Sequence, residues 1–131
     1  MNIGMEAHDG KKILMQNFCI AYRGILGRHN IYATGTTGRL IEETTGLTVH
    51  KYLSGNLGGE QQMAAQVEHN ELDLMIFLRD SESRFARETE PNPVIRLCDK
   101  YNIPLATNLA TAELLLPLLD QNERNLEGTN G

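Results

Sequence analysis

Short apolar runs recur along the chain and are separated by stretches in which apolar and polar residues alternate with a longer period. The run at residues 72–78 (LDLMIFL) is apolar at every position but one, which is typical of a central parallel strand covered on both faces. The other runs also have the usual length of a strand. The sequence therefore predicts five strands, at residues 2–6, 30–34, 48–53, 72–78 and 103–107.

The segments between these runs carry apolar residues at a spacing of three and four, as amphipathic helices do. The predicted helices cover residues 11–22, 39–44, 59–69, 93–101 and 110–119. This alternation predicts an α/β fold with three layers, a mainly parallel five-stranded sheet with helices on both faces. We expect one domain over residues 1–119 and a polar, flexible tail over residues 120–131.

Composition narrows the range of functions. The chain has 131 residues, with 12 basic against 17 acidic side chains and a net charge of −5. This balance argues against a general nucleic-acid-binding protein, which needs a basic face. No apolar run approaches the ~18 residues that span a bilayer, and the first residues have no secretory pattern. We therefore expect a cytoplasmic protein without nucleic-acid or membrane partners.

Cysteine and histidine give no metal-binding pattern. Cys19 and Cys98 form no CxxC motif, and without an export signal they are expected as reduced thiols in the core. His29, His50 and His69 share no metal spacing and are expected at the surface. The sequence therefore predicts no metal site.

Glycine and threonine follow the second predicted strand. Thr34, Gly35, Thr36 and Thr37 lie where that strand gives way to a helix, at the edge where parallel α/β sheets bind ligands. Hydroxyls and backbone N–H groups at a helix N-terminus suit a phosphate. The segment is neither a Walker loop nor a GxGxxG fingerprint, and a threonine N-cap with a tight glycine turn is an equal alternative.

A second glycine-rich turn and a lysine point to the same edge. Ser54 and Gly55, followed by Gly58 and Gly59, can offer a hydroxyl and exposed backbone to the same anion, or form a plain loop between strand and helix. Lys12 lies at the start of a helix, where the helix dipole does not favour a cation. A phosphate partner explains that placement, and an ordinary solvated lysine is the alternative.

Three ionisable residues at this edge are suited to proton transfer. His8 can polarise a carbonyl or shuttle a proton, or it can make a structural hydrogen bond at the strand end. Asp9 stands at the expected N-cap of the first helix, and capping is the stronger alternative for it. Glu60 starts a helix, and it is either a first-turn acid that stabilises the helix dipole or a general base beside the anion.

Together, these motifs resemble methylglyoxal synthase over residues 2–119 without obvious gaps. The resemblance implies a homohexamer of a five-stranded α/β domain. It also implies a carbon–oxygen lyase that converts a small phosphorylated ligand, dihydroxyacetone phosphate, to methylglyoxal and inorganic phosphate without a metal or cofactor. The matching stretches are His8-Asp9 with Lys12, residues 32–38 (YATGTTG), residues 53–62 (LSGNLGGEQQ), Arg96-Leu97 and residues 102–112 (NIPLATNLATA).

The same resemblance assigns roles to the residues at the sheet edge. By this likeness, His8 and Asp9 would face the oxygens of the substrate, and Glu60 occupies the position of the family's catalytic aspartate. The phosphate would be held by Lys12, Thr34, Thr36, Thr37, Ser54 and Gly55.

Four positions depart from the family pattern. Glu60 replaces an aspartate, and Glu6 stands where the family is apolar. In a gapless alignment, Arg87 stands in place of the histidine that polarises the substrate carbonyl, and Glu90 in place of a second aspartate. Arg87 cannot give up its proton at ordinary pH, although it is well suited to gripping a phosphate or a carboxylate.

These departures leave three hypotheses. The chain is a working synthase with Glu60 as base and an altered loop, or a non-catalytic family member that binds or sequesters a phosphorylated metabolite or nucleotide. The third hypothesis is an enzyme with changed chemistry on a related phosphate ester. All three predict phosphate binding, and turnover of dihydroxyacetone phosphate separates them.

Overall fold

In the described part of the chain, five parallel strands form one sheet in the order β3-β2-β1-β4-β5. The computed structural model describes residues 1–53, 57–82 and 92–130, with side chains described up to residue 127. β1 lies at the centre and pairs with both β2 and β4. The strands are β1 (Asn2–Ala7), β2 (Asn30–Ala33), β3 (Val49–Lys51), β4 (Leu74–Leu78) and β5 (Leu105–Ala106).

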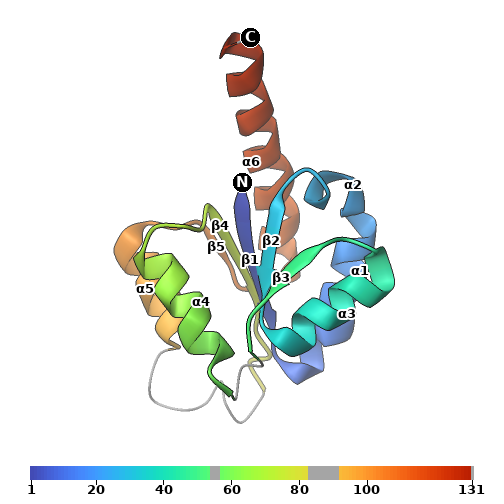
Figure 1. The fold of residues 1–131 in the computed structure, drawn as a ribbon, viewed down its shortest axis with the longest axis vertical. Helices are drawn as coiled ribbons and strands as arrows, with labels where there is room; N and C mark the ends of the chain where they lie inside the picture. Colours follow the sequence, from blue (N-terminus) through green and yellow to red (C-terminus); the bar gives the residue numbers. More distant parts are fainter. Residues whose placement is uncertain (54–56, 83–91, 131) are drawn as a thin grey trace.

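Helices cover both faces of the sheet, which gives three layers (Figure 1). The helices are η1 (Asp9–Lys11), α1 (Lys12–Ala21), α2 (Arg23–Leu26), α3 (Gly35–Thr45), α4 (Gly59–Glu68), α5 (Pro93–Tyr101) and α6 (Leu109–Asn130). Helices α4 and α5 pack on one face, whereas α1, α3 and α6 pack on the other. The C-terminal part of α6 projects beyond the sheet. No described helix combines the length and the apolar character that crossing a membrane requires.

Alternation along the central strands sends side chains into two separate cores. Ile3, Met5 and Ala7 of β1 belong to the cluster beneath α1, α3 and α6. Met75 and Phe77 of β4 belong to the cluster beneath α4 and α5. Because both faces are buried, a shift of one residue in strand pairing would exchange the two cores, so the register of the sheet is strongly specified.

The predicted fold class is confirmed, and all described strand pairs are parallel. The helix predicted at residues 93–101 has the same bounds as α5, which Asn92 caps and which has proline in its first turn. Helix α3 begins at Gly35 and not at residue 39 as predicted. Glycine and threonine have low helix propensities, and this composition hid the first turn of α3.

Residues 120–130, which were predicted as a flexible tail, continue α6 as helix. Asp120 is 3% exposed, accepts a hydrogen bond from Arg28 at 2.8 Å and lies 2.8 Å from the ring of His29. The amino group of Met1 lies 3.1 Å from the carboxylate of Glu123. These contacts with Met1, Arg28 and His29 hold α6 in place at the point where its polar part begins. The domain boundary at residue 119 stays a prediction.

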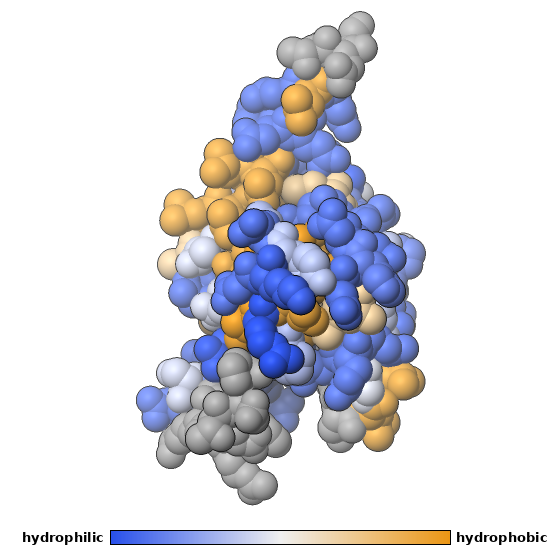
Figure 2. Space-filling view, turned by 90° about the vertical axis from the view of Figure 1, so that its left-hand side faces the viewer, coloured by the Kyte–Doolittle hydropathy of each residue, from blue (hydrophilic) through white to orange (hydrophobic). Residues whose placement is uncertain are grey.

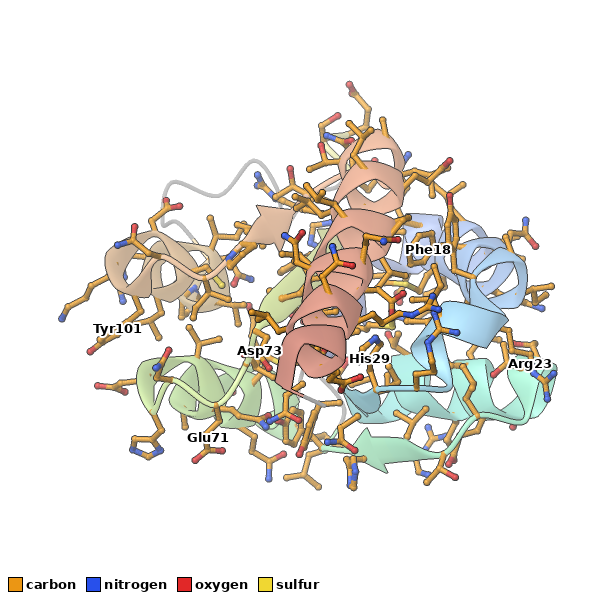
Figure 3. The ribbon with its side chains drawn as sticks, turned by 90° about the horizontal axis from the view of Figure 1, so that it is seen from above. Phe18, Arg23, His29, Glu71, Asp73 and Tyr101 are labelled. Atoms are coloured by element: carbon orange, nitrogen blue, oxygen red, sulfur yellow. The ribbon has the colours of Figure 1, made fainter. Side chains whose placement is uncertain are left out.

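The expected positions of the histidines and cysteines are confirmed in part. His50 and His69 are exposed, and Cys19 and Cys98 are buried free thiols, as predicted. The side chain of His29 is only 4% exposed, and Figure 3 shows it beneath α6. Its predicted surface position is therefore wrong, because α6 covers it.

Removal of the Asp120 carboxylate tests how α6 is held. Asp120→Ala is expected to lower the free energy of unfolding by about 2 kcal/mol, because Arg28 and the buried His29 lose their acceptor. The hydrogen bond from Arg28, and then that from His29, lowers the pKa of Asp120. This stabilisation is therefore present above the pKa of the unfolded carboxyl group and is lost as the pH falls through the folded one.

Urea unfolding at pH 7 and at strongly acidic pH measures both effects, with the exposed Glu127→Ala on the same helix as control. The difference between wild type and Asp120→Ala should narrow in acid. Equal stability of the two proteins at pH 7 would contradict this account of α6.

Candidate functional site

The carboxyl ends of β1 and β4 define the place where a ligand can bind. The two strands are paired up to Ala7 and Leu78, but β1 is followed by β2 on one side and β4 by β5 on the other. Such a switch in strand order opens a crevice at the carboxyl edge of a parallel sheet. His8 follows β1, and its backbone N–H donates to the carbonyl of Leu78 at 3.1 Å.

His8 is held in one tautomer at this edge. Its Nδ1 lies 2.9 Å from the backbone N–H of Asp80, which can only donate, so Nδ1 is the acceptor. Burial lowers the pKa of His8, and the charge of Arg79 lowers it further, whereas the charge of Glu60 acts in the opposite sense. The ring also packs edge-on against Phe77, with centroids 5.3 Å apart. The geometry leaves a neutral imidazole with its proton on Nε2, a hydrogen-bond donor.

Lys12 brings a positive charge to the end of β1. Its ammonium donates to the carbonyl of Ala7 at 3.3 Å and to the carboxylate of Asp9 at 2.8 Å. The hydrogen bond and charge of Lys12 lower the pKa of the exposed Asp9. The capping alternative for Asp9 is wrong, because His8 occupies the cap position of η1 and no side chain caps that turn.

The first turn of α3 offers unused polar groups. Thr34 stands at the N-cap, but its side chain makes no cap hydrogen bond, so the capping alternative is not what the structure has. Thr37 is 1% exposed, and its hydroxyl has no partner among the described residues. Gly35 is buried and Thr36 is exposed on the same turn. A buried orphan hydroxyl at a helix N-terminus fits an absent anion.

Glu60 lies in the first turn of α4, after Gly58 in the left-handed conformation with φ of 107°. The side chain of Asn92 connects it to α5. The carbonyl oxygen of Asn92 accepts from the N–H of Val94 at 2.8 Å and caps α5, while its amide nitrogen donates to Oε1 of Glu60. Asn92 therefore fixes one oxygen of the Glu60 carboxylate.

Four predicted site residues lie outside the described residues, namely Ser54, Gly55, Arg87 and Glu90. In residues 1–53, 57–82 and 92–127, no group of three or more His, Cys, Asp or Glu side chains is placed to hold a metal ion. The site that the structure does describe consists of an imidazole, an ammonium, an uncapped helix N-terminus and an anchored carboxylate.

Comparison with known proteins places this arrangement in a family. The sequence profile of the MGS-like domain matches residues 16–107. A methylglyoxal synthase of Caldicellulosiruptor saccharolyticus is 55% identical over 123 residues, which cover 94% of this chain and 87% of the relative. The chain belongs to the methylglyoxal synthase family.

Other members of the methylglyoxal synthase family agree with this assignment. The methylglyoxal synthase of Listeria welshimeri is 53% identical over 116 residues, which cover 88% of this chain and 87% of the relative. The crystal structure of methylglyoxal synthase from Elizabethkingia anophelis superposes with a TM-score of 0.81 at 38% identity, covering 88% of this chain and 76% of that one. The resemblance inferred from the sequence motifs is confirmed.

The structure brings the described candidates of this family site to one edge of the sheet. They lie after β1, after β2 and at the start of α4, and they comprise His8, Asp9, Lys12, Thr34, Gly35, Thr36, Thr37 and Glu60. The individual roles of these residues stay predictions. Sequence reasoning missed Asn92 as a partner of Glu60, although Asn-Pro before a helix is a recognised capping signal.

The tautomer of His8 can be tested in solution. At pH 7 His8 is expected to be neutral with its proton on Nε2, because Nδ1 accepts from Asp80 and burial lowers the pKa of the ring. Two-bond ¹H–¹⁵N correlation spectra read both properties, and the His8→Ala variant identifies the signal. A proton on Nδ1 at pH 7 would contradict the geometry.

Proposed function

We propose that the chain is a methylglyoxal synthase, which converts dihydroxyacetone phosphate to methylglyoxal and inorganic phosphate. The observation that carries the proposal is the anchored carboxylate of Glu60 at the carboxyl edge, in a chain 55% identical to a named methylglyoxal synthase. The required chemistry is removal of a proton from carbon beside a carbonyl, followed by loss of phosphate. A carboxylate, a neutral donor and an anion site suffice for it.

The phosphate of the substrate binds between Lys12 and the first turn of α3 in this proposal. The ammonium of Lys12 supplies a charge-assisted contact, and the orphan hydroxyl of Thr37 supplies a donor. Thr34, Gly35 and Thr36 add hydroxyls and backbone N–H groups from the uncapped helix end. From the sequence, Ser54 and Gly55 complete the anion site.

Glu60 is the general base of the proposed reaction. It takes a proton from the hydroxymethyl carbon, and the electrons of that C–H bond form the enediolate. The Nε2–H of His8, with Asp9 nearby, hydrogen-bonds the substrate oxygens as their charge grows. The hydroxyl group on the carbon that lost its proton then becomes a carbonyl and its proton passes to the phosphate, while the double bond shifts to the terminal carbon and phosphate leaves with the electron pair of the carbon–oxygen bond. The resulting enolate takes up a proton on its terminal carbon, which gives methylglyoxal.

The hydrogen bond from Asn92 explains how Glu60 can serve at the position where the family has an aspartate. A longer side chain moves its oxygens by about one bond length, and a misplacement of about 1 Å can lower a rate by ~10²-fold. Asn92 donates to Oε1 of Glu60 and is itself fixed as the cap of α5. The added methylene is therefore held in one conformation.

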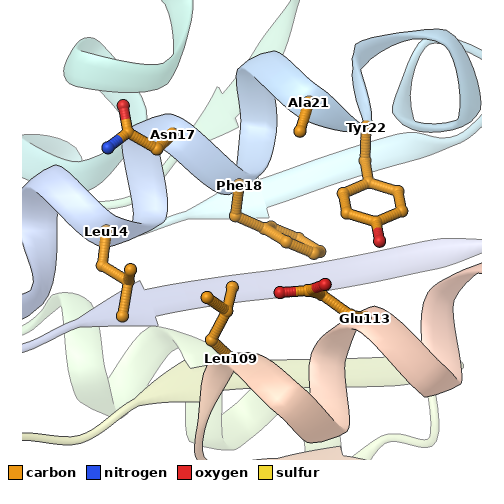
Figure 4. Close-up of a pocket in the computed structure, with 7 residues that line it drawn as sticks. All are labelled: Leu14, Asn17, Phe18, Ala21, Tyr22, Leu109 and Glu113. Carbon is orange, nitrogen blue, oxygen red and sulfur yellow. The ribbon is translucent and has the colours of Figure 1, made fainter.

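We also propose self-association as a homohexamer and a cytoplasmic location. Apolar side chains are exposed on α1 and α6, among them Ile13, Ile20, Leu114 and Leu118. Figure 4 shows an open pocket between the same two helices, with Phe18 of α1 and Leu109 of α6 in its lining, and Figure 2 shows apolar residues below the projecting end of α6. Burial of this apolar surface between copies of the chain would favour self-association. The substrate is a charged phosphate ester, which supports the cytoplasm, where such esters are made, as the location.

Lys12 provides the first test of the anion site. Lys12→Ala is expected to weaken the binding of inorganic phosphate about tenfold or more, because a charge-assisted contact is lost. Isothermal titration calorimetry measures the change, and Lys11→Ala is the control for loss of one positive charge next to the site. Equal affinities of Lys12→Ala and wild type would place the anion elsewhere.

Glu60 provides the test of the chemistry. Glu60→Gln is expected to lower kcat for dihydroxyacetone phosphate by about 10² to 10⁴, the usual contribution of a general base. Binding of inorganic phosphate should survive, since glutamine keeps an oxygen for the Asn92 amide. Assays of methylglyoxal release measure the change in kcat. The exposed Glu68→Gln on the same helix is the control. An active Glu60→Gln enzyme would exclude Glu60 as the base.

A further inference from the structure

Glu6 places a buried carboxyl group near the carboxyl end of β1, two residues before His8, and the proposed reaction does not use it. Alternation along β1 puts Ile3, Met5 and Ala7 beneath α1, α3 and α6, so the side chain of Glu6 lies on the opposite face, under α4 and α5. There it lies beside Phe77, its partner in the register of β1 and β4. The residue is 8% exposed.

The carboxyl group of Glu6 has no compensating partner among the described residues. Its Oε2 is buried and accepts no hydrogen bond. Among the described residues, the charges of Glu60 at the start of α4 and of Lys12 at the start of α1 act on it, whereas β4 presents the apolar ring of Phe77. The ammonium of Lys12 is already bonded to Asp9 at 2.8 Å. Ionised Glu6 would thus be a buried charge beside a like charge.

The surroundings of Glu6 favour the protonated, neutral form of its carboxyl group. Burial and, next, the charge of Glu60 raise the pKa of Glu6 to about 8, while the charge of Lys12 acts in the opposite sense. At neutral pH Glu6 is therefore expected to keep its proton.

We propose that Glu6 acts through Glu60 as the neutral member of a carboxyl pair, which limits the site to one carboxylate charge near the bound phosphate. Glu6 is then a positioning residue and not a catalytic one. The inference rests on the proposed function, in which Glu60 is the base and Lys12 holds the phosphate. When Glu6 loses its proton, a second negative charge acts on both Glu60 and the anion, so turnover and anion binding weaken together.

Comparison of wild type with Glu6→Gln across pH 6 to 10 tests the pair, because glutamine has nearly the same shape and cannot ionise. In wild type, kcat/KM for dihydroxyacetone phosphate is expected to fall about fivefold or more as the pH rises through the pKa of Glu6, toward a lower plateau, because anion binding and turnover both weaken. The fall should be absent in Glu6→Gln and in Glu6→Val, a second variant that fills the site with an apolar side chain. A merely structural role for Glu6 would leave the same alkaline fall in all three proteins.

Sulfate binding gives a readout without turnover, since the charge of sulfate is constant over this range. The ratio of the dissociation constants of wild type and Glu6→Gln should rise about fivefold between pH 7 and pH 9, as a negative charge appears near the anion. A constant ratio overturns the proposal. Absent turnover together with a rising ratio would reject the synthase reaction and keep the effect of Glu6 on the anion site.

Thermal unfolding tests the buried proton on its own. The folded pKa of Glu6 lies above the unfolded value of 4.5, so the wild type loses stability relative to Glu6→Gln as pH rises from 4.5 to about 8. Outside this window the difference in Tm should be constant. A difference that does not change between pH 4.5 and pH 8 would show that Glu6 ionises normally and would overturn the proposal.

Discussion

The pairing of β1 with both β2 and β4 is the constraint on which the site depends. It fixes a switch in strand order at the centre of the sheet, where the loop after β1 meets the end of β4. His8 is tied there by its own N–H to Leu78 and by its ring to Asp80. The candidate residues thus lie where the fold already forms a crevice.

Electrostatics at that edge are local. An acidic chain of net charge −5 does not attract an anion with its surface as a whole, so the proposed anion site rests on Lys12, a helix N-terminus and hydroxyl groups. The same edge holds two carboxyl groups, Glu6 and Glu60, of which one is buried deeply enough to keep its proton. In the proposed reaction, one cation and one carboxylate allow the same small site to bind a phosphate and to remove a proton.

The sequence predicts those features that depend on residues close together in the chain. Apolar periodicity predicted the order of the five strands along the chain and the bounds of α5. Contacts between distant residues were not predictable in this way. His29 is buried only because Asp120, ninety-one positions later, docks α6 over it. The bond between Asn92 and Glu60 likewise depends on the packing of α5 against α4.

The ³¹P NMR spectrum of the wild-type protein with dihydroxyacetone phosphate tests the central claim most directly. The account predicts that the phosphate-ester signal decays while the inorganic phosphate signal grows by the same amount, with methylglyoxal appearing in the proton spectrum. An ester signal that shifts or broadens on binding but keeps its full intensity would contradict it, because the site would then bind the phosphate without breaking its carbon–oxygen bond.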